Sequence, residues 1–134
     1  AKLRGALLVE RLAARHAQEF NVPFASVADT GAAFDRVRTA CEAADRDPAT
    51  MVFSAAQVLC CGADAAEVER RAAAIGREPE ELRRNGAAGT PDEVVARLEA
   101  FAELGATRAY LQVLDLADLD HLRFVAAEVM PRLS

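Results

Sequence analysis

Cys60 and Cys61 are the residues whose types and spacing most readily suggest chemistry. Adjacent thiols can form a strained disulfide or a redox centre, but they can equally be two small apolar residues that point to opposite faces of a strand. The chain has one further cysteine, Cys41, no Cys-x-x-Cys spacing, and no histidine near this pair in sequence. The pattern therefore favours packing, and the odd count argues against a secreted disulfide scaffold.

Three aspartates and a histidine form a second cluster, made up of Asp115, Asp118, Asp120 and His121. These side chains are metal-ligand types, but no second His or Cys group lies at ligand spacing. Acidic residues are also expected in the first turn of a helix, where they complement its dipole. We therefore predict helix capping and no metal site. A secondary role for His121 at the mouth of a ligand site stays open.

Asn21 and Gln112 are polar side chains near the carboxyl ends of apolar segments. A buried amide must find a hydrogen-bond partner, and in a barrel such residues point into or around the substrate mouth. For Asn21 and Gln112, ligand binding and a hydrogen bond to the backbone are equally good interpretations. Together with one residue of the cysteine pair and the histidine, they give the substrate-mouth candidates Asn21, Cys60, Gln112 and His121.

The segment Asn85–Thr90 precedes a helix start, where backbone N–H groups can hold an anion. Arg83 and Arg84 lie just upstream and would suit a phosphate. The segment is neither a Walker loop nor a Gly-x-Gly-x-x-Gly turn, because no lysine follows it and its glycine spacing differs. A plain connecting loop is the preferred interpretation.

Alternating helices and strands must position these residues. Short apolar runs predict strands over residues 19–24, 51–61 and 107–114, and the second is so continuously apolar that it is typical of a strand buried on both faces. Helical spacing of apolar residues, such as Leu8, Leu12 and Ala13 in the first segment, and capping signals predict the remaining elements. The predicted helices cover residues 7–20, from Ser26 to Asp47-Pro48, 63–76, 79–84, from Thr90 to Gly105, and from Leu116 to Pro131.

This order implies βαβ crossovers and an α/β fold with about three parallel strands flanked by helices. Such a sheet is thin, and edges this apolar need covering. The sequence therefore predicts that a second copy or a complementing half completes the structure. We expect self-association.

Length and composition narrow the function classes. The chain has 134 residues, the size of one domain and too few for a (β/α)8 barrel of ~250 residues. A net charge of −5 with no tryptophan argues against nucleic-acid binding. No apolar run reaches the ~20 residues of a membrane span, and the apolar part of the first residues is too short for a secretory signal. We expect a cytoplasmic protein with no membrane partner.

Several segments resemble the luciferase-like monooxygenase superfamily, and most closely its deazaflavin (coenzyme F420)-dependent oxidoreductases. Each segment is a weak match alone, but their order and spacing make the set specific, and it covers nearly all residues from Leu12 onward. The similar segments are LAARHAQEFN (12–21), CEAADRDP (41–48), GTPDEV (89–94), YLQVLDLADLDHL (110–122) and EVMPRL (128–133).

The resemblance implies a partial (β/α)8, TIM-barrel-like fold, with residues 1–134 a single domain that corresponds to the C-terminal part of the barrel, strands six to eight. Family members bind a flavin or deazaflavin at the carboxyl ends of the strands and transfer a hydride to or from a small organic substrate, or use the reduced flavin with oxygen. The implied cofactor is coenzyme F420 or FMN, with no cofactor in this chain alone as the alternative. Asn21, Cys60–Gly62 and Gln112–Asp115 would face the cofactor mouth.

Two departures from the family limit what the resemblance implies. The family's cofactor contacts lie mainly in its first five strands, including a glycine-rich phosphate loop, and residues 1–11 are unrelated to that segment. No catalytic residue is carried over, and the chain alone is expected to be inactive, so whether it is itself an enzyme stays open. It is either the C-terminal portion of an oxidoreductase, or a non-catalytic remnant or interaction module that self-associates through open barrel edges.

Overall fold

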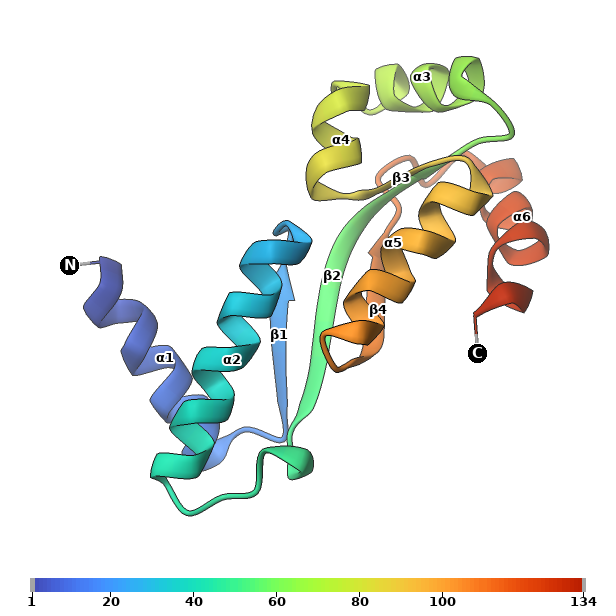
Figure 1. The fold of residues 1–134 in the computed structure, drawn as a ribbon. Coiled ribbons are helices and arrows are strands. Elements are labelled where there is room, and N and C mark those ends of the chain that lie inside the picture. The colour runs from blue at the N-terminus through green and yellow to red at the C-terminus, as the bar shows by residue number, and fades with distance from the viewer. Residues whose placement is uncertain (1, 134) are drawn as a thin grey trace.

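The computed structural model describes residues 2–133 as helices packed around one parallel sheet (Figure 1). Single 3-10 turns lie at Pro48–Thr50 and Met130–Arg132. In chain order the elements are α1 (Lys2–His16), β1 (Glu19–Pro23), α2 (Val27–Ala43), β2 (Val52–Cys61), α3 (Ala65–Ala74), α4 (Pro79–Asn85), β3 (Ala87–Gly89), α5 (Pro91–Glu103), β4 (Ala106–Gln112) and α6 (Leu119–Glu128).

Strand β2 is the centre of the sheet, and its three neighbours all run parallel to it. Residues 52–56 pair with β1 and residues 53–58 with β4, while residues 59–61 at the carboxyl end pair with β3. The α/β class and the partial, TIM-barrel-like arrangement of parallel strands predicted from the sequence are therefore confirmed. The continuously apolar segment 51–61 is the buried central strand.

The sheet has a fourth strand, β3, where the sequence predicted a plain loop. That prediction was wrong because Ala-Ala-Gly has none of the β-branched or aromatic residues that mark strands. The three residues are buried, and they become a strand by pairing with Leu59–Cys61 at the end of β2.

Helix α1 ends earlier than predicted, and only part of its apolar spacing is buried. It ends at His16, because the following residues enter β1. Of the apolar residues whose spacing predicted this helix, Leu8 and Leu12 are 56% and 50% exposed. Ala13 and Ala14 are buried instead, because these small side chains let α1 approach α2 closely.

Helix α2 begins at the predicted capping residue. The Ser26 hydroxyl accepts the backbone N–H of Asp29 at 3.1 Å. The helix buries Phe34, whose ring lies 4.7 Å from that of Phe53 on β2. This contact anchors α2 against the amino-terminal half of the central strand.

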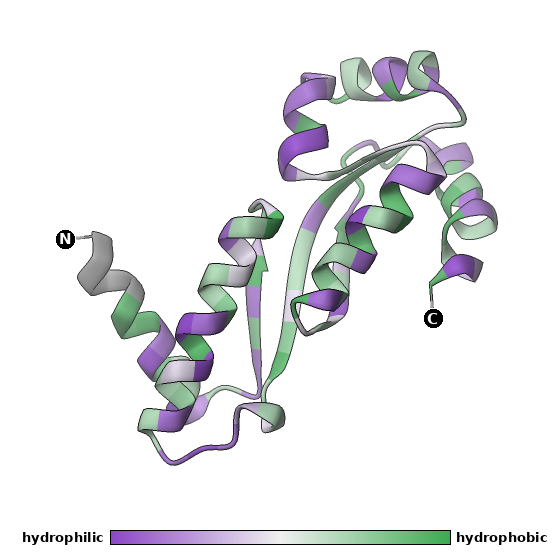
Figure 2. Ribbon diagram, in the orientation of Figure 1, coloured by the Kyte–Doolittle hydropathy of each residue, from purple (hydrophilic) through white to green (hydrophobic). Residues whose placement is uncertain are grey.

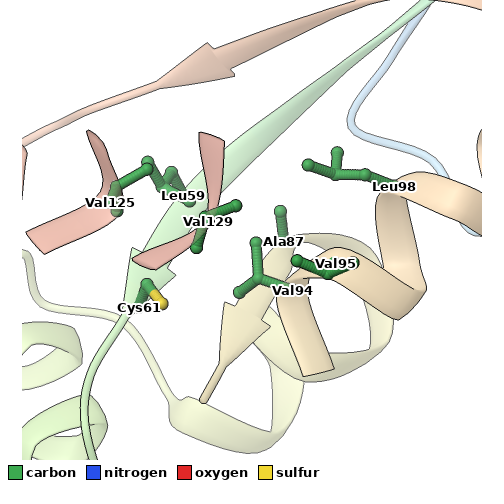
Figure 3. Close-up of a cluster of buried hydrophobic side chains, with 8 residues drawn as sticks. All are labelled: Leu59, Cys61, Ala87, Val94, Val95, Leu98, Val125 and Val129. Carbon is green, nitrogen blue, oxygen red and sulfur yellow. The ribbon is translucent and has the colours of Figure 1, made fainter. Parts of the chain in front are cut away.

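Buried apolar side chains form three clusters along β2. One lies under α1 and α2, and another under α3 and α4. The third joins the carboxyl end of β2 to α5 and α6, and its residues converge in Figure 3. Figure 2 shows the apolar length of β2, the polar surface of α4, and an apolar band on the described part of α1. Across residues 2–133, every helix is too short or too polar to cross a membrane.

Candidate functional site

A cleft of about 340 Å³ opens at the carboxyl ends of the strands. In parallel α/β structures, this is the edge of the sheet where ligands bind. The ends of β1, β2 and β4 and the α3–α4 pair contribute its lining, which consists of Phe24, Val58, Arg77, Glu81, Asn85, Gln112 and Leu114.

One face of the sheet leads from the amino ends of the strands to this cleft. The strand register places Asn21 beside Ser54, and Val58 beside Gln112, on that face. The Asn21 side-chain amide donates to the Ser54 hydroxyl at 2.9 Å. Asn21 is therefore held by its neighbour on β2, whereas Gln112 lies in the cleft lining with an exposed side chain.

The same face carries a polar network that the sequence analysis missed. Arg108 Nη1 donates to Glu19 at 2.6 Å, and the Tyr110 hydroxyl donates to the other oxygen of Glu19 at 2.9 Å. Hydrogen bonds from Ser54 and Tyr110 lower the pKa of Glu19, and the charge of Arg108 acts in the same direction. Alternation of Arg108, Tyr110 and Gln112 along one strand is the period-2 signal that could have revealed this face.

Phe24 has an unusual backbone conformation at the edge of the cleft. Its φ of 54° lies in the left-handed region, which bulky residues rarely adopt. Its N–H donates to the carbonyl of Ala56 at 2.8 Å, which holds the residue at the end of β1, and its side chain is 51% exposed. Strained conformations of this kind concentrate at functional sites, where they aim a side chain.

The wall opposite the strands carries opposite charges that neutralise one another. Arg77 Nη2 donates to both carboxylate oxygens of Glu81, at 3.0 and 2.8 Å. Asn85, at the end of α4, also lines this wall. The cleft therefore offers an aromatic ring and two side-chain amides, and its lining contains no cation without a carboxylate partner.

Beside the cleft, four polar side chains hold the end of β2, and we call this group the Arg71 clamp: Glu67, Arg71, Asp118 and His121. The backbone N–H of Cys61 donates to His121 Nε2 at 3.0 Å, and its carbonyl accepts Arg71 Nη1 at 2.8 Å. Arg71 Nη1 also donates to Glu67. Side chains from α6 and α3 thus take the place of a neighbouring strand.

Arg71 also connects α3 to the start of α6. Its Nε donates to one oxygen of Asp118 at 2.9 Å, and the other oxygen caps α6 by accepting the His121 N–H at 3.0 Å. Arg71 is only 7% exposed and His121 4%. Burial, and then the charge of Arg71, lower the pKa of His121, so the ring is held neutral as an acceptor.

The structure separates the four substrate-mouth candidates. Gln112 lines the cleft, and Asn21 lies on the same face of the sheet nearer the amino ends of the strands. Cys60 is buried against α3, with Sγ 3.5 Å from the carbonyl of Val68, and His121 is engaged in the clamp. Both line only a gap of about 10 Å³, which is too small for an organic ligand.

The acidic cluster caps the start of α6, as the sequence predicted. Asp118 is the N-cap residue, and Asp115 accepts the backbone N–H of Ala117 at 3.1 Å. Among residues 2–133, no three or more His, Cys, Asp or Glu side chains are grouped so as to hold a metal ion.

All three thiols are expected to resist modification in the folded protein. Cys41, Cys60 and Cys61 are free and buried, and burial raises the pKa of Cys61 to about 11. Because the thiolate is the reactive species, a disulfide-exchange reagent such as DTNB should label none of them in native buffer and all of them in denaturant. Rapid labelling of the native chain would contradict this packing.

Three solved structures with the same fold are redox enzymes. Coenzyme F420-dependent tetrahydromethanopterin reductase from Methanopyrus kandleri matches with a TM-score of 0.75 and 16% identity, over 96% of this chain and 49% of that one. An F420-dependent secondary alcohol dehydrogenase in complex with an F420–acetone adduct gives 0.75 and 13%, over 96% and 46%. A long-chain alkane monooxygenase gives 0.72 and 15%, over 92% and 38%.

At these identities the likeness establishes the fold, and it confirms at that level the resemblance to luciferase-like and F420-dependent enzymes. The chain spans about half the length of the first two structures and less of the third. No protein-family model matches the sequence, and the search for curated relatives finds no match.

Proposed function

We propose that this chain forms the C-terminal part of the barrel of a luciferase-like oxidoreductase, and that its cleft holds a planar, uncharged part of a deazaflavin or flavin, or the small organic substrate beside it. The position of the cleft, at the carboxyl ends of parallel strands, carries the proposal. The F420-dependent enzymes with the same fold support the cofactor class.

The lining residues fit a ring system better than a phosphate. The half-exposed ring of Phe24 offers an apolar surface, and the amides of Asn85 and Gln112 offer both donors and acceptors. Arg77 is the only cation in the lining, and Glu81 already occupies it. A phosphorylated tail would therefore be bound by residues outside this cleft.

In this arrangement the chain's own residues bind the ring and orient it. Phe24 would pack against one face of the ring, and Gln112 would hydrogen-bond to a polar edge. The bound cofactor would supply hydride transfer. Proton transfer by His121 is excluded because its Nε2 is engaged with the Cys61 backbone away from the cleft.

A titration of the purified chain with coenzyme F420 and with FMN tests this proposal. Saturable quenching of cofactor fluorescence is expected, and Phe24→Gly should weaken binding about tenfold, equivalent to roughly 1.4 kcal/mol. The same change relieves the strained φ, so stability should not fall. Gln112→Ala should also weaken binding, whereas Gln18→Ala, an exposed glutamine outside the cleft, should not. Failure of both cofactors to bind would overturn the proposal.

The alternative function is a non-catalytic interaction module. Four exposed apolar side chains on α1, those of Leu7, Leu8, Val9 and Leu12, favour it. Among residues 2–133, the outer edge of β4 also has no partner strand. Soluble monomers rarely expose such surfaces. Self-association without cofactor binding would support this second candidate.

A further inference from the structure

An asparagine–glycine dipeptide, Asn85–Gly86, lies at the edge of the cleft. Asparagine is chemically labile, and a following glycine makes it most so, because no side chain shields the next backbone nitrogen from the asparagine amide carbon. Asn85 is the last residue of α4, where it is exposed and lines the cleft. The proposed function uses its amide but gives no reason for the glycine that follows.

The structure requires glycine at position 86. A Cβ atom there would lie 2.8 Å from the carbonyl oxygen of Leu82 and 2.9 Å from that of Val58, closer than side-chain carbons approach backbone oxygens. Gly86 is buried where the end of α4 meets the carboxyl half of β2. Packing therefore imposes the glycine, and the asparagine before it acquires a reactive neighbour.

Hydrogen bonds keep the reactive nitrogen occupied while the last turn of α4 is closed. The Gly86 N–H donates to the carbonyl of Leu82 at 2.7 Å. Arg97 of α5 holds the same turn, since its Nη1 donates to the carbonyl of Arg84 at 3.2 Å and its Nη2 to that of Arg83. The Gly86 nitrogen must leave its hydrogen bond to reach the preceding side chain, so this turn has to open before any reaction.

Helix α4 is built to open locally. It has seven residues, Pro79–Asn85, and Leu82 is the buried one among them. Figure 2 shows its polar surface. Short helices with little buried apolar surface have low local stability, so their ends open far more often than the whole chain unfolds.

We propose that Asn85 is a site of spontaneous deamidation, gated by the last turn of α4. In the open turn the Gly86 nitrogen attacks Cγ of Asn85, the Cγ–Nδ2 bond breaks, and ammonia leaves with the proton of the attacking nitrogen. Water then opens the cyclic imide at either carbonyl and gives aspartate or isoaspartate. One water is consumed for each ammonia released, and nothing is oxidised or reduced.

This reaction changes the charge of the cleft. The wall that carries Asn85 is neutral in the unmodified chain, because Arg77 Nη2 donates to both carboxylate oxygens of Glu81. A carboxylate at position 85 makes that wall negative and removes a hydrogen-bond donor from the lining. The isoaspartate product also lengthens the backbone between α4 and β3.

Peptide mass spectrometry of the full chain, aged in mildly alkaline buffer, tests the site. Asn21 is the matched internal control, because it is the only other asparagine, precedes the β-branched Val22, and donates its amide to Ser54 at 2.9 Å. We expect aspartate and isoaspartate to accumulate at position 85 while Asn21 stays intact, and Asn85→Gln should abolish the more acidic form of the chain. An intact Asn85, or equal reaction at both asparagines, would overturn the proposal.

The rate of deamidation in guanidinium chloride tests the gate. We expect the native chain to react about tenfold more slowly than the denatured chain, equivalent to an opening free energy of about 1.4 kcal/mol. Arg97→Met removes the donors to the last carbonyls of α4, so it should raise the native rate severalfold and leave the denatured rate unchanged.

Arg123→Met is the control for this variant, because Arg123 is an exposed arginine of α6, and neither rate should change. Circular dichroism confirms that each variant is folded. Equal native and denatured rates would refute the gate, as would a native rate that Arg97→Met leaves unchanged. These readouts need no cofactor, so they are independent of the titration that tests the proposed function.

Discussion

Replacing Arg71 with methionine is expected to lower the free energy of unfolding by about 3–5 kcal/mol, the usual cost of removing one partner from a buried ionic network. Methionine keeps much of the apolar stem but leaves the Cys61 carbonyl without its donor and the carboxylate of Asp118 without its cation. Because the Arg71 clamp joins α3 to α6, the loss should be larger than at any exposed arginine.

Urea denaturation of Arg71→Met beside Arg70→Met provides the measurement. Arg70 is adjacent on the same helix but exposed, so its replacement should change stability by no more than about 0.5 kcal/mol. Equal midpoints for the two variants would show that the Arg71 clamp contributes nothing to folding.

Acid is expected to destabilise the protein through His121. Burial and the Arg71 charge hold the pKa of His121 below its usual value of 6.5, so the unfolded chain takes up a proton first as the pH falls. The contribution of the neutral ring is therefore complete above about pH 6.5 and is lost as the pH falls toward the folded pKa. One such group changes stability by at most about 1.4 kcal/mol per pH unit.

The groups around His121 determine the pH range of the measurement. Arg71 and Glu67 face it from α3, Asp115 and Asp118 from the preceding turn, and β2 contributes the backbone N–H of Cys61. Burial alone would raise the pKa of Asp118, but the hydrogen bonds from Arg71 and the His121 N–H, together with the Arg71 charge, lower it. Burial raises the pKa of the Cys61 thiol. The effect of His121 protonation on the unfolding free energy is therefore measured between about pH 5 and 7.

Glutamine at position 121 separates the charge from the hydrogen bond. His121→Gln retains an acceptor and does not titrate, so its unfolding free energy should vary less with pH across this range than that of the native chain. His16→Gln is the control, because His16 is exposed and lies outside the Arg71 clamp. Parallel curves for the native chain and His121→Gln would rule out this role.

The sequence was sufficient for the elements that have a strong residue pattern. Continuous apolar residues predicted β2, and Ser26 marked the start of α2. Ala87–Gly89 could not be recognised as a strand, because its residue types do not favour strands. Only its pairing with β2 makes it one. In α1, periodicity identified an apolar face but not which face is buried, because close packing on α2 selected the alanines over Leu8 and Leu12.

Sequence reasoning could place a residue in the candidate site only where its position along a strand determines its location. Gln112 was placed at a strand end by its apolar neighbours, and it lines the cleft. The engagement of His121 with Cys61 depends on residues 60 positions apart, and no local pattern encodes that contact. The left-handed φ of Phe24 is likewise a property of the folded backbone, since phenylalanine itself disfavours it.

The distance along the chain between the partners in the Arg71 clamp also orders events during synthesis. Cys61 must wait for His121, and Arg71 for Asp118, which emerges from the ribosome 47 residues later. Until then the end of β2 has unsatisfied hydrogen-bonding groups and can pair with another nascent strand. The carboxyl end of β2 therefore gains its hydrogen-bond partners only after α6 has been synthesised. Helices α1 and α2 and the first half of β2 can fold well before that.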